Sequence, residues 1–266
     1  MKTFLGFILC WLCAGEAFAA VQTEVFEYRD GETVLEGMLA YDDASAVQRP
    51  GILVVHEWKG LGPYAVRRAE QLARLGYVAL AVDMYGKGVR AKDHEEAAKL
   101  SGAYRADRSL TRGRILTALE ALQTHELVDR SRIAAIGYCF GGMTVLELAR
   151  SGADILGVVS FHGSLDTPSP EHAKQITAKV LVLHGAEDGF VKQEQVAAFE
   201  QEMKDAGVDY RLIQYPGAVH GFTVQEAGND PSAGVAYNQE ADEQSWEEMK
   251  AFFQELFSHS EVERIG

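Results

Sequence analysis

The sequence predicts a single α/β domain built on a mostly parallel, doubly wound sheet with helices on both faces. Short apolar runs alternate with segments whose apolar residues recur at helical spacing. No internal repeat, low-complexity tract or Pro/Gly/Ser-rich linker divides the chain. With 266 residues, of which 47% are hydrophobic and 24% charged, the chain can form one large core. Ligands of such sheets bind beyond the carboxyl ends of the strands.

The first residues have the pattern of a signal peptide. Lys2 precedes an apolar run over residues 4–12, and small residues follow at Ala17 and Ala19. We expect residues 1–19 to be removed, a single α/β domain to occupy residues 20–266, and the protein to be periplasmic or secreted. The apolar run is shorter than the roughly 20 residues of a membrane helix, so no membrane anchor is expected.

The expected strands are short runs, and those at 52–56 and 78–82 are continuously apolar. An opening pair covers residues 24–28 and 33–41. The later runs are 52–56, 78–82, 133–136, 156–161, 180–183 and 210–214. Continuous apolar runs of this length are typical of strands that are buried on both faces of a parallel sheet.

The expected helices lie between these runs. The first begins at Pro63, which the first turn of a helix tolerates, and ends at Gly76. The other helices present apolar residues at helical spacing. These residues are Ile115, Leu119 and Leu122; Leu146 and Leu148; Val196, Phe199 and Met203; and Trp246, Met249, Phe253 and Leu256.

A glycine-rich turn follows the strand at 133–136. It reads Gly-Tyr-Cys-Phe-Gly-Gly over residues 137–142, which matches the Gly-x-nucleophile-x-Gly turn of α/β-hydrolases with Cys139 in place of serine. Flanking glycines allow the strand and helix backbones to approach each other. Removal of the signal peptide would leave Cys139 as the only cysteine. A free cysteine is most often a small buried hydrophobe, and it is the turn that favours a nucleophile.

Two later residues complete a catalytic pattern. Asp188 follows the strand at 180–183 and His220 follows the strand at 210–214, so nucleophile, acid and histidine occur in the order that this fold uses. Acyl transfer requires a base for the thiol proton and a carboxylate that orients the imidazole. The alternatives are a hydrogen-bonded surface histidine for His220 and a helix cap before Val191 for Asp188.

The loop after the strand at 52–56 is expected to border the site. In this fold that loop donates a backbone N–H to the oxyanion, and Trp58 is the expected donor, with Phe140 as the second. Glu57 lies in the same loop, where a merely solvated carboxylate is the alternative to a direct role. His162 and His184 end strands, and a turn-stabilising hydrogen bond is the alternative to lining the site.

The net charge and the spacing of the histidines disfavour a nucleic-acid interface and a metal site. The net charge of −14 and the pI near 5.0 disfavour a nucleic-acid partner, and no basic run with interleaved aromatics occurs. No histidine falls into a metal spacing such as His-Glu-x-x-His, so neither a metal nor another cofactor is expected.

The chain resembles the dienelactone hydrolase family over about residues 25–257, most specifically in the turn at 137–142. The resemblance implies an α/β-hydrolase fold and the following roles: Cys139 as nucleophile, His220 as base, Asp188 as orienting acid, and the N–H groups of Trp58 and Phe140 as oxyanion hole. It also implies a role for Glu57, since the family's acidic residue there hydrogen-bonds the resting thiol and accepts its proton when substrate arrives.

The residues that would hold a substrate carboxylate depart from the family. Val224 stands near where the family has an arginine after the catalytic histidine, and a second arginine belongs in the loop where Lys87 and Arg90 are the candidates. Loss of a bidentate clamp is not a conservative change. We therefore expect a small uncharged or weakly anionic ester or lactone rather than dienelactone itself. The expected pocket residues are Tyr85, Lys87, Arg90, His162 and Phe222.

Two other functions stay open. One is a non-catalytic small-molecule binding protein on the same fold, since a fold does not determine function. The other is an esterase that acts on acylated sugars or peptides. The sequence assigns neither an oligomeric state nor a role for the polar loop at 229–238.

Overall fold

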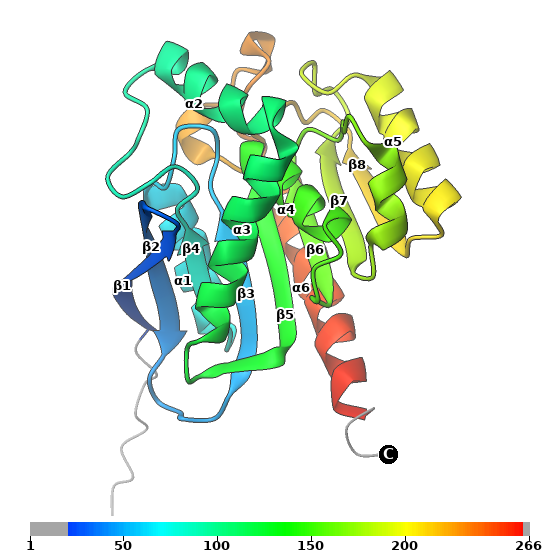
Figure 1. Ribbon diagram of the computed structural model, residues 1–266. Coiled ribbons are helices and arrows are strands. Elements are labelled where there is room, and N and C mark those ends of the chain that lie inside the picture. Colours follow the sequence, from blue (N-terminus) through cyan, green and yellow to red (C-terminus); the bar gives the residue numbers. More distant parts are fainter. Residues whose placement is uncertain (1–20, 263–266) are drawn as a thin grey trace, which may run out of the picture.

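The computed structural model describes residues 21–262, which form one eight-stranded sheet between two layers of helices (Figure 1). The expected signal peptide at 1–19 lies outside the described residues. The strand order is β1-β2-β4-β3-β5-β6-β7-β8. The strands are β1 (Val21–Asp30), β2 (Thr33–Asp42), β3 (Arg49–Val55), β4 (Val78–Val82), β5 (Val128–Tyr138), β6 (Gly157–Phe161), β7 (Lys179–Gly185) and β8 (Tyr210–Tyr215).

The strands from β3 to β8 are mutually parallel, whereas β2 is antiparallel to both β1 and β4. Every expected strand is present, and the predicted fold class is confirmed. Strand β3 shows why its run is apolar throughout. Leu53 and Val55 pack into the core on one face of the sheet, and Ile52 and Val54 pack into the core on the other.

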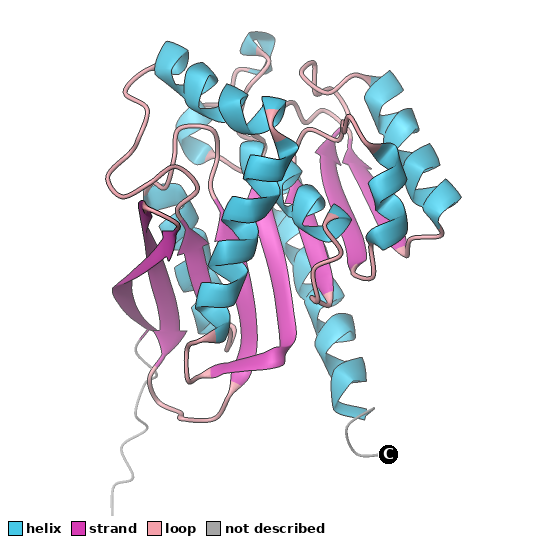
Figure 2. Cartoon of the chain, viewed as in Figure 1, coloured by secondary structure: helices cyan, strands magenta, loops and turns pink. Residues whose placement is uncertain are grey.

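The helices are α1 (Pro63–Arg74), α2 (His94–Ala106), α3 (Arg108–Gln123), α4 (Phe140–Arg150), α5 (Gln193–Ala206) and α6 (Gln239–Val262), with the short 3-10 helices η1 (Pro170–Gln175), η2 (Gln225–Ala227) and η3 (Pro231–Ala233). Helices α1 and α6 cover one face of the sheet, and α3, α4 and α5 cover the other (Figure 1). In Figure 2 the arrowheads of β7 and β8 point to an edge where loops gather. No helix within residues 21–262 combines the length and apolarity needed to cross a membrane.

Helix α2 was not predicted from the sequence. Its buried residues are Ala97, Ser101 and Tyr104, so its inner face lacks the apolar stripe by which the other helices were found. Its start is nevertheless encoded locally, because the side chain of Asp93 accepts a hydrogen bond from the backbone N–H of Glu96.

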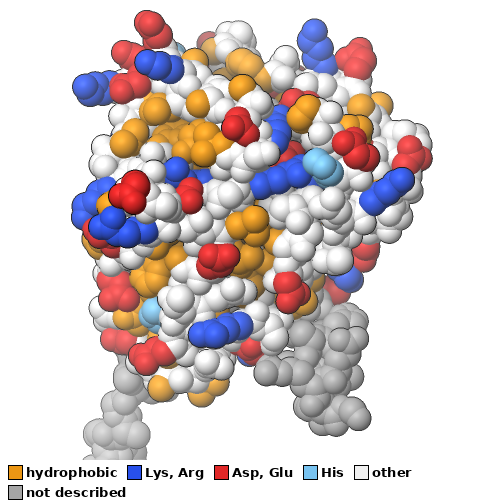
Figure 3. All heavy atoms as spheres, in the orientation of Figure 1, with side chains coloured by type: hydrophobic (Ala, Val, Ile, Leu, Met, Phe, Trp, Pro, Cys, Tyr) orange, Lys and Arg blue, Asp and Glu red, His pale blue; other side chains and the backbone are white. Residues whose placement is uncertain are grey.

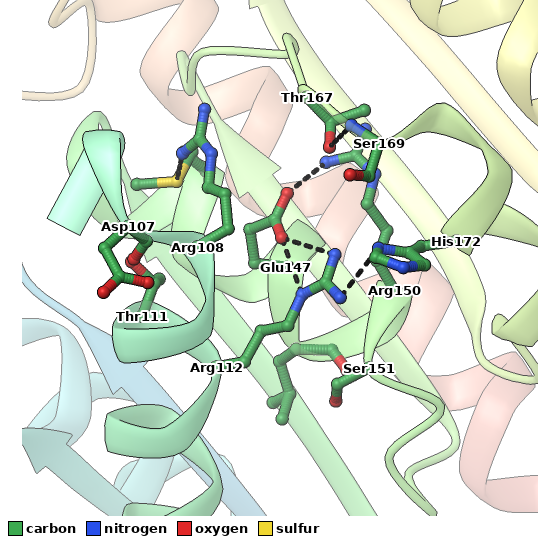
Figure 4. A network of polar contacts seen from close by, with 12 residues as sticks. Asp107, Arg108, Thr111, Arg112, Glu147, Arg150, Ser151, Thr167, Ser169 and His172 are labelled. Atoms are coloured by element: carbon green, nitrogen blue, oxygen red, sulfur yellow. Dashed lines mark hydrogen bonds and ion pairs between the residues drawn. The ribbon is translucent and has the colours of Figure 1, made fainter.

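A buried ionic network fixes helix α4 against its neighbours (Figure 4). Glu147 and Arg150 are both fully buried and lie 3.1 Å apart. Arg150 also donates to both carboxylate oxygens of Glu202 on α5, at 2.7 and 2.8 Å. Arg112 on α3 donates to Glu147 at 2.8 Å and contacts His172 at 2.9 Å. The helix that begins at the glycine-rich turn is thus joined directly to α3 and α5, and through Arg112 to η1.

The face shown in Figure 3 carries scattered charged side chains of both signs. Acidic and basic side chains are interspersed on it, with small hydrophobic patches between them.

Candidate active site

Cys139 occupies the sharp turn between β5 and α4. Its φ of 53° and ψ of −110° are unfavourable for a residue with a side chain. A Cβ atom at Gly137 would lie 2.0 Å from the carbonyl oxygen of Gly141, and one at Gly141 would lie 2.3 Å from that of Val55. Both positions therefore require glycine, and the turn holds Cys139 at the carboxyl edge of the sheet.

The structure brings Cys139, His220 and Asp188 into one row. The Nε2 atom of His220 lies 3.1 Å from the Sγ of Cys139, and its Nδ1 lies 2.8 Å from Oδ2 of Asp188. The Oδ1 atom of Asp188 accepts hydrogen bonds from the backbone N–H groups of Phe190 and Val191, at 2.8 and 3.3 Å. Asp188 thus makes both kinds of contact considered for it, one oxygen with the imidazole and the other with the backbone of the turn.

The pKa values of His220 and Asp188 are both shifted by their neighbours in this row. Burial by itself lowers the pKa of His220, but the negative charge of Cys139 and the hydrogen bond to Asp188 outweigh it and raise that pKa to about 10. Burial by itself raises the pKa of Asp188, but the hydrogen bond and charge of His220 outweigh it and hold that pKa below its ordinary value. The site therefore favours a protonated imidazole at His220 beside an ionised Asp188.

The two backbone donors expected for the oxyanion lie at the start of α4 and in the loop after β3. Phe140 is the first residue of α4, so its N–H is one of the donors that a helix leaves without an internal acceptor. In the described part of the chain, neither the Phe140 nor the Trp58 N–H donates to a backbone carbonyl.

The loop that carries Trp58 is fixed from beneath by buried groups. The hydroxyl of Tyr85 donates to the carbonyl oxygen of Trp58 at 2.9 Å. The N–H of Met84 donates to Nε2 of His56 at 3.3 Å, so the proton of this neutral ring lies on Nδ1, which donates to the carbonyl oxygen of Glu57 at 2.5 Å. Burial lowers the pKa of His56 to about 4, in keeping with its neutral form.

Glu57 lies near His220 but makes no hydrogen bond to the sulfur. The thiol's hydrogen-bond partner is His220, and no bond joins Glu57 to Cys139 within residues 21–262. Burial raises the pKa of Glu57, and the positive charge of His220 acts in the opposite direction. The carboxylate–thiol hydrogen bond that the family resemblance implies is therefore not formed in this conformation.

Three of the expected pocket residues do not face an open pocket, which corrects that part of the sequence interpretation. The ammonium of Lys87 forms ion pairs with Glu27 and Glu36 at 2.7 and 2.9 Å, over β1 and β2 at one end of the sheet. His162 and Phe222 lie at the predicted edge of the sheet, but both side chains are completely buried there. Other side chains pack over both rings, so neither can line an open pocket.

The other two expected pocket residues remain close to the Trp58 loop. Tyr85 is 8% exposed and acts on that loop through its hydroxyl. Arg90 is exposed, and the next residue, Ala91, donates its N–H to the carbonyl oxygen of Lys59 at 2.9 Å. Arg90 is therefore the expected pocket cation that the structure keeps beside the site.

Sequence reasoning missed one aromatic residue at the site and left one loop without a role. Phe190 is 63% exposed, and its ring centroid lies 5.2 Å from that of His220. Its position two residues after Asp188 was the sequence feature that could have predicted a place at the site. The loop at 229–238 contacts the histidine as well, because the N–H of Ala236 donates to the carbonyl oxygen of His220 at 3.1 Å and Val235 forms a β-bridge with it.

Comparison with known proteins agrees with this geometry. The family model described as "Dienelactone hydrolase family" matches residues 35–257. The chain belongs to the dienelactone hydrolase family. Within the part of this family member that the structure describes, no three His, Cys, Asp or Glu side chains are grouped so that they could hold a metal ion.

Similar proteins extend over nearly the whole domain. A solved structure described as a dienelactone hydrolase-like promiscuous phosphotriesterase from metagenomic libraries is 38% identical, covers 89% of this chain and 99% of its own, and has a TM-score of 0.84. A putative carboxymethylenebutenolidase of Synechocystis sp. is 28% identical over 83% of this chain and 91% of its own. A probable 2-oxo-3-(5-oxofuran-2-ylidene)propanoate lactonase of Bradyrhizobium sp. is 29% identical over 76% of this chain and 86% of its own.

Proposed function

We propose that this protein hydrolyses a small ester or lactone with Cys139 as nucleophile, through an acyl-cysteine intermediate. The observation that carries the proposal is the unbroken row from sulfur to imidazole to carboxylate, with contacts of 3.1 and 2.8 Å. The names of the Synechocystis and Bradyrhizobium relatives support an ester or lactone substrate.

The proposed reaction has two halves. The thiolate of Cys139 attacks the carbonyl carbon, a C–S bond forms, and the N–H groups of Trp58 and Phe140 stabilise the oxyanion. Collapse of this intermediate breaks the C–O bond, and the protonated His220 gives its proton to the leaving alkoxide. A water molecule, deprotonated by His220, then cleaves the acyl-cysteine and releases the acid and the thiolate. With a lactone, alcohol and acid leave as one hydroxy acid.

The substrate is proposed to be uncharged or weakly anionic. Val224 has no charge to offer a carboxylate, and Lys87 is neutralised by two glutamates. Arg90 alone of the expected cations stays exposed beside the Trp58 loop. The exposed ring of Phe190 next to His220 supports an apolar group on the substrate.

Replacement of the sulfur tests the proposal. Cys139→Ala is expected to lower the turnover of a short aryl ester by about a thousandfold or more, because nucleophile and base act as one unit. Circular dichroism and the melting temperature are expected to stay close to those of the parent. Mass spectrometry during turnover is expected to detect an acyl group on Cys139. Unchanged turnover in the Cys139→Ala variant would remove this residue from the reaction.

A substrate panel separates the alternatives. It should contain lactones, short aryl esters, acetylated xylan fragments, aminoacyl esters and a phosphotriester, since one relative is described as a promiscuous phosphotriesterase. Highest kcat/KM on lactones or simple esters supports the proposal, and highest kcat/KM on acylated sugars or peptides replaces it. An iodoacetamide-inert Cys139 with no turnover of any compound indicates a binding protein.

We also propose that the enzyme is exported, on the basis of the pattern in residues 1–19. N-terminal sequencing of protein from the periplasm or medium of its host is expected to begin at residue 20 or 21. A chain that retains Met1 in the cytoplasm would contradict export.

A further inference from the structure

We propose that His162 is a positioning residue that holds Cys139 and His220 in register by hydrogen bonds to both of the segments that carry them. The proposal rests on the function proposed above and adds residues that the reaction steps do not use. It concerns groups that lie beneath the site rather than in contact with substrate.

The first bond of His162 goes to the nucleophile's own backbone. The N–H of Cys139 points to Nδ1 of His162 at 3.2 Å and to the carbonyl oxygen of Phe161 at 3.0 Å. His162 has a φ of 38°, and within the described residues only Cys139 shares a positive φ without being glycine. Two residues in costly backbone conformations are therefore held directly against each other.

The second bond goes to the segment of the base. Because Nδ1 accepts, the proton of the His162 ring lies on Nε2, which donates to Oγ1 of Thr223 at 2.8 Å. Burial lowers the pKa of His162 well below its ordinary value, so the ring is neutral and has one donor and one acceptor nitrogen. Thr223 follows His220 by three residues, and the His162 ring also packs edge-on against that of His220 at 5.2 Å.

The far end of this chain of bonds is anchored in two helices. The hydroxyl of Tyr64 on α1 donates to Oγ1 of Thr223 at 2.7 Å, and Nε of Arg68 donates to that hydroxyl at 3.2 Å. Arg68 also donates to the backbone oxygen of Thr223 at 3.3 Å and forms an ion pair with Asp242 on α6. Thr223 is thereby fixed through both its side chain and its backbone.

The geometry has a mechanical consequence. Cys139 and His220 belong to segments 81 positions apart, and the His162 ring bridges them with a hydrogen bond on each side. The backbone of Cys139 cannot move relative to Thr223 unless one of these bonds lengthens or the ring tilts. A misplacement of about 1 Å between reacting groups can cost about a hundredfold in rate.

Thr223→Val tests the bridge, because it removes Oγ1 while it keeps the shape of the side chain. We expect kcat on a short aryl ester to fall about tenfold or more while KM changes by less than about twofold, since alignment rather than binding is lost. Thr223→Ser, which keeps the hydroxyl, is expected to restore kcat to within about threefold of the parent.

The matched control is Thr111→Val. Thr111 is also fully buried and also uses its hydroxyl, which donates to the backbone oxygen of Tyr104 at 2.7 Å, but it lies on α3 outside the chain of bonds. The same substitution there is expected to lower the melting temperature without changing kcat. Equal kcat in the two valine variants, or no recovery in Thr223→Ser, would overturn the proposal.

His162→Asn provides a second, independent variant. Asparagine tolerates positive φ and keeps an acceptor for the Cys139 N–H, but it is too short to reach Thr223. Its kcat is expected to match that of Thr223→Val, and the double variant is expected to lose little more, because both changes break one bridge. If the losses of kcat in the two single variants were fully additive in the double variant, the bridge would be contradicted. Cys139→Ala, measured in parallel, separates the two proposals: full turnover there refutes the proposed function, whereas no turnover there with full kcat in Thr223→Val refutes only the bridge.

Discussion

The Nε2 atom of His220 lies 3.1 Å from the Sγ of Cys139, although 81 positions separate the two residues. The contact joins the loop after β8 to the turn after β5, which are three strands apart in the sheet. Each residue follows the carboxyl end of a parallel strand, so the topology of the sheet brings them to the same edge.

Asp188→Asn is expected to weaken the protonated state of His220. Charge and hydrogen bonding from Asp188 help to raise the pKa of His220 from the ordinary 6.5 to about 10. A raised pKa contributes stability that is complete below the ordinary pKa and is lost as the pH rises through the folded value. In the variant this loss is expected to begin at lower pH, and kcat is expected to fall about a hundredfold or more.

Urea denaturation of parent and Asp188→Asn across about pH 6 to pH 11 measures this shift. The parent is expected to lose stability toward pH 10 and the variant earlier. Overlapping stability profiles would show that Asp188 does not hold the charge on His220.

Glu57→Gln is expected to leave the alkylation of resting Cys139 by iodoacetamide within about twofold of the parent rate, because the thiol bonds to His220 and not to Glu57. His220→Gln is the comparison, and its alkylation rate is expected to fall about tenfold, since the imidazole that takes the thiol proton is gone. A large increase in alkylation of Glu57→Gln would instead show that the carboxylate shields the resting thiol, as the family resemblance implies.

Tyr85→Phe is expected to lower kcat by about threefold to tenfold, since it removes the hydrogen bond to the carbonyl oxygen of Trp58 and thereby loosens the residue whose N–H is proposed to serve the oxyanion. KM is expected to stay within about twofold. Tyr210→Phe is a suitable control, because this residue begins β8 away from the Trp58 loop. A kcat equal to that of the control would exclude a role of this hydrogen bond in catalysis.

Glu147→Gln is expected to reduce the free energy of unfolding by about 3 kcal/mol, because it leaves buried Arg150 and Arg112 with too little negative charge. Glu70→Gln, which breaks the exposed pair with Arg74 at 3.5 Å, is expected to cost less than about 1 kcal/mol. Urea denaturation measures both values. Similar losses in the two variants would mean that the network in Figure 4 contributes no more than a surface pair.

The sheet could be predicted because its information is local. The run at 78–82 is apolar at all five positions, and β4 is buried at all five. Helix α2 was not predicted because Ser101 lies on its buried face, where its hydroxyl donates a hydrogen bond to the carbonyl oxygen of Ala97. A polar residue that finds its partner one turn away disrupts the apolar period without disrupting the helix.

The substrate pocket was harder to predict because it depends on how deeply each side chain is buried and on contacts with residues far away in the sequence. The sequence places His162 at a strand end, but its burial results from packing against Tyr138, His220 and Phe222. The role of Lys87 was misjudged for a similar reason, since Glu27 precedes it by sixty positions. Neither relationship has a spacing that a single sequence reveals.

Gly137 and Gly141, which have no room for a Cβ, belong to a part of the site that does not tolerate mutation, whereas other parts of the site do. A mutagenesis library aimed at new substrates would gain nothing from randomising those two positions, because almost every member would misfold at the turn. Substitutions that could change the substrate belong in the loops that bring Phe190 and Arg90 next to the site. These side chains are exposed and belong to no strand, so their replacement leaves the sheet unchanged.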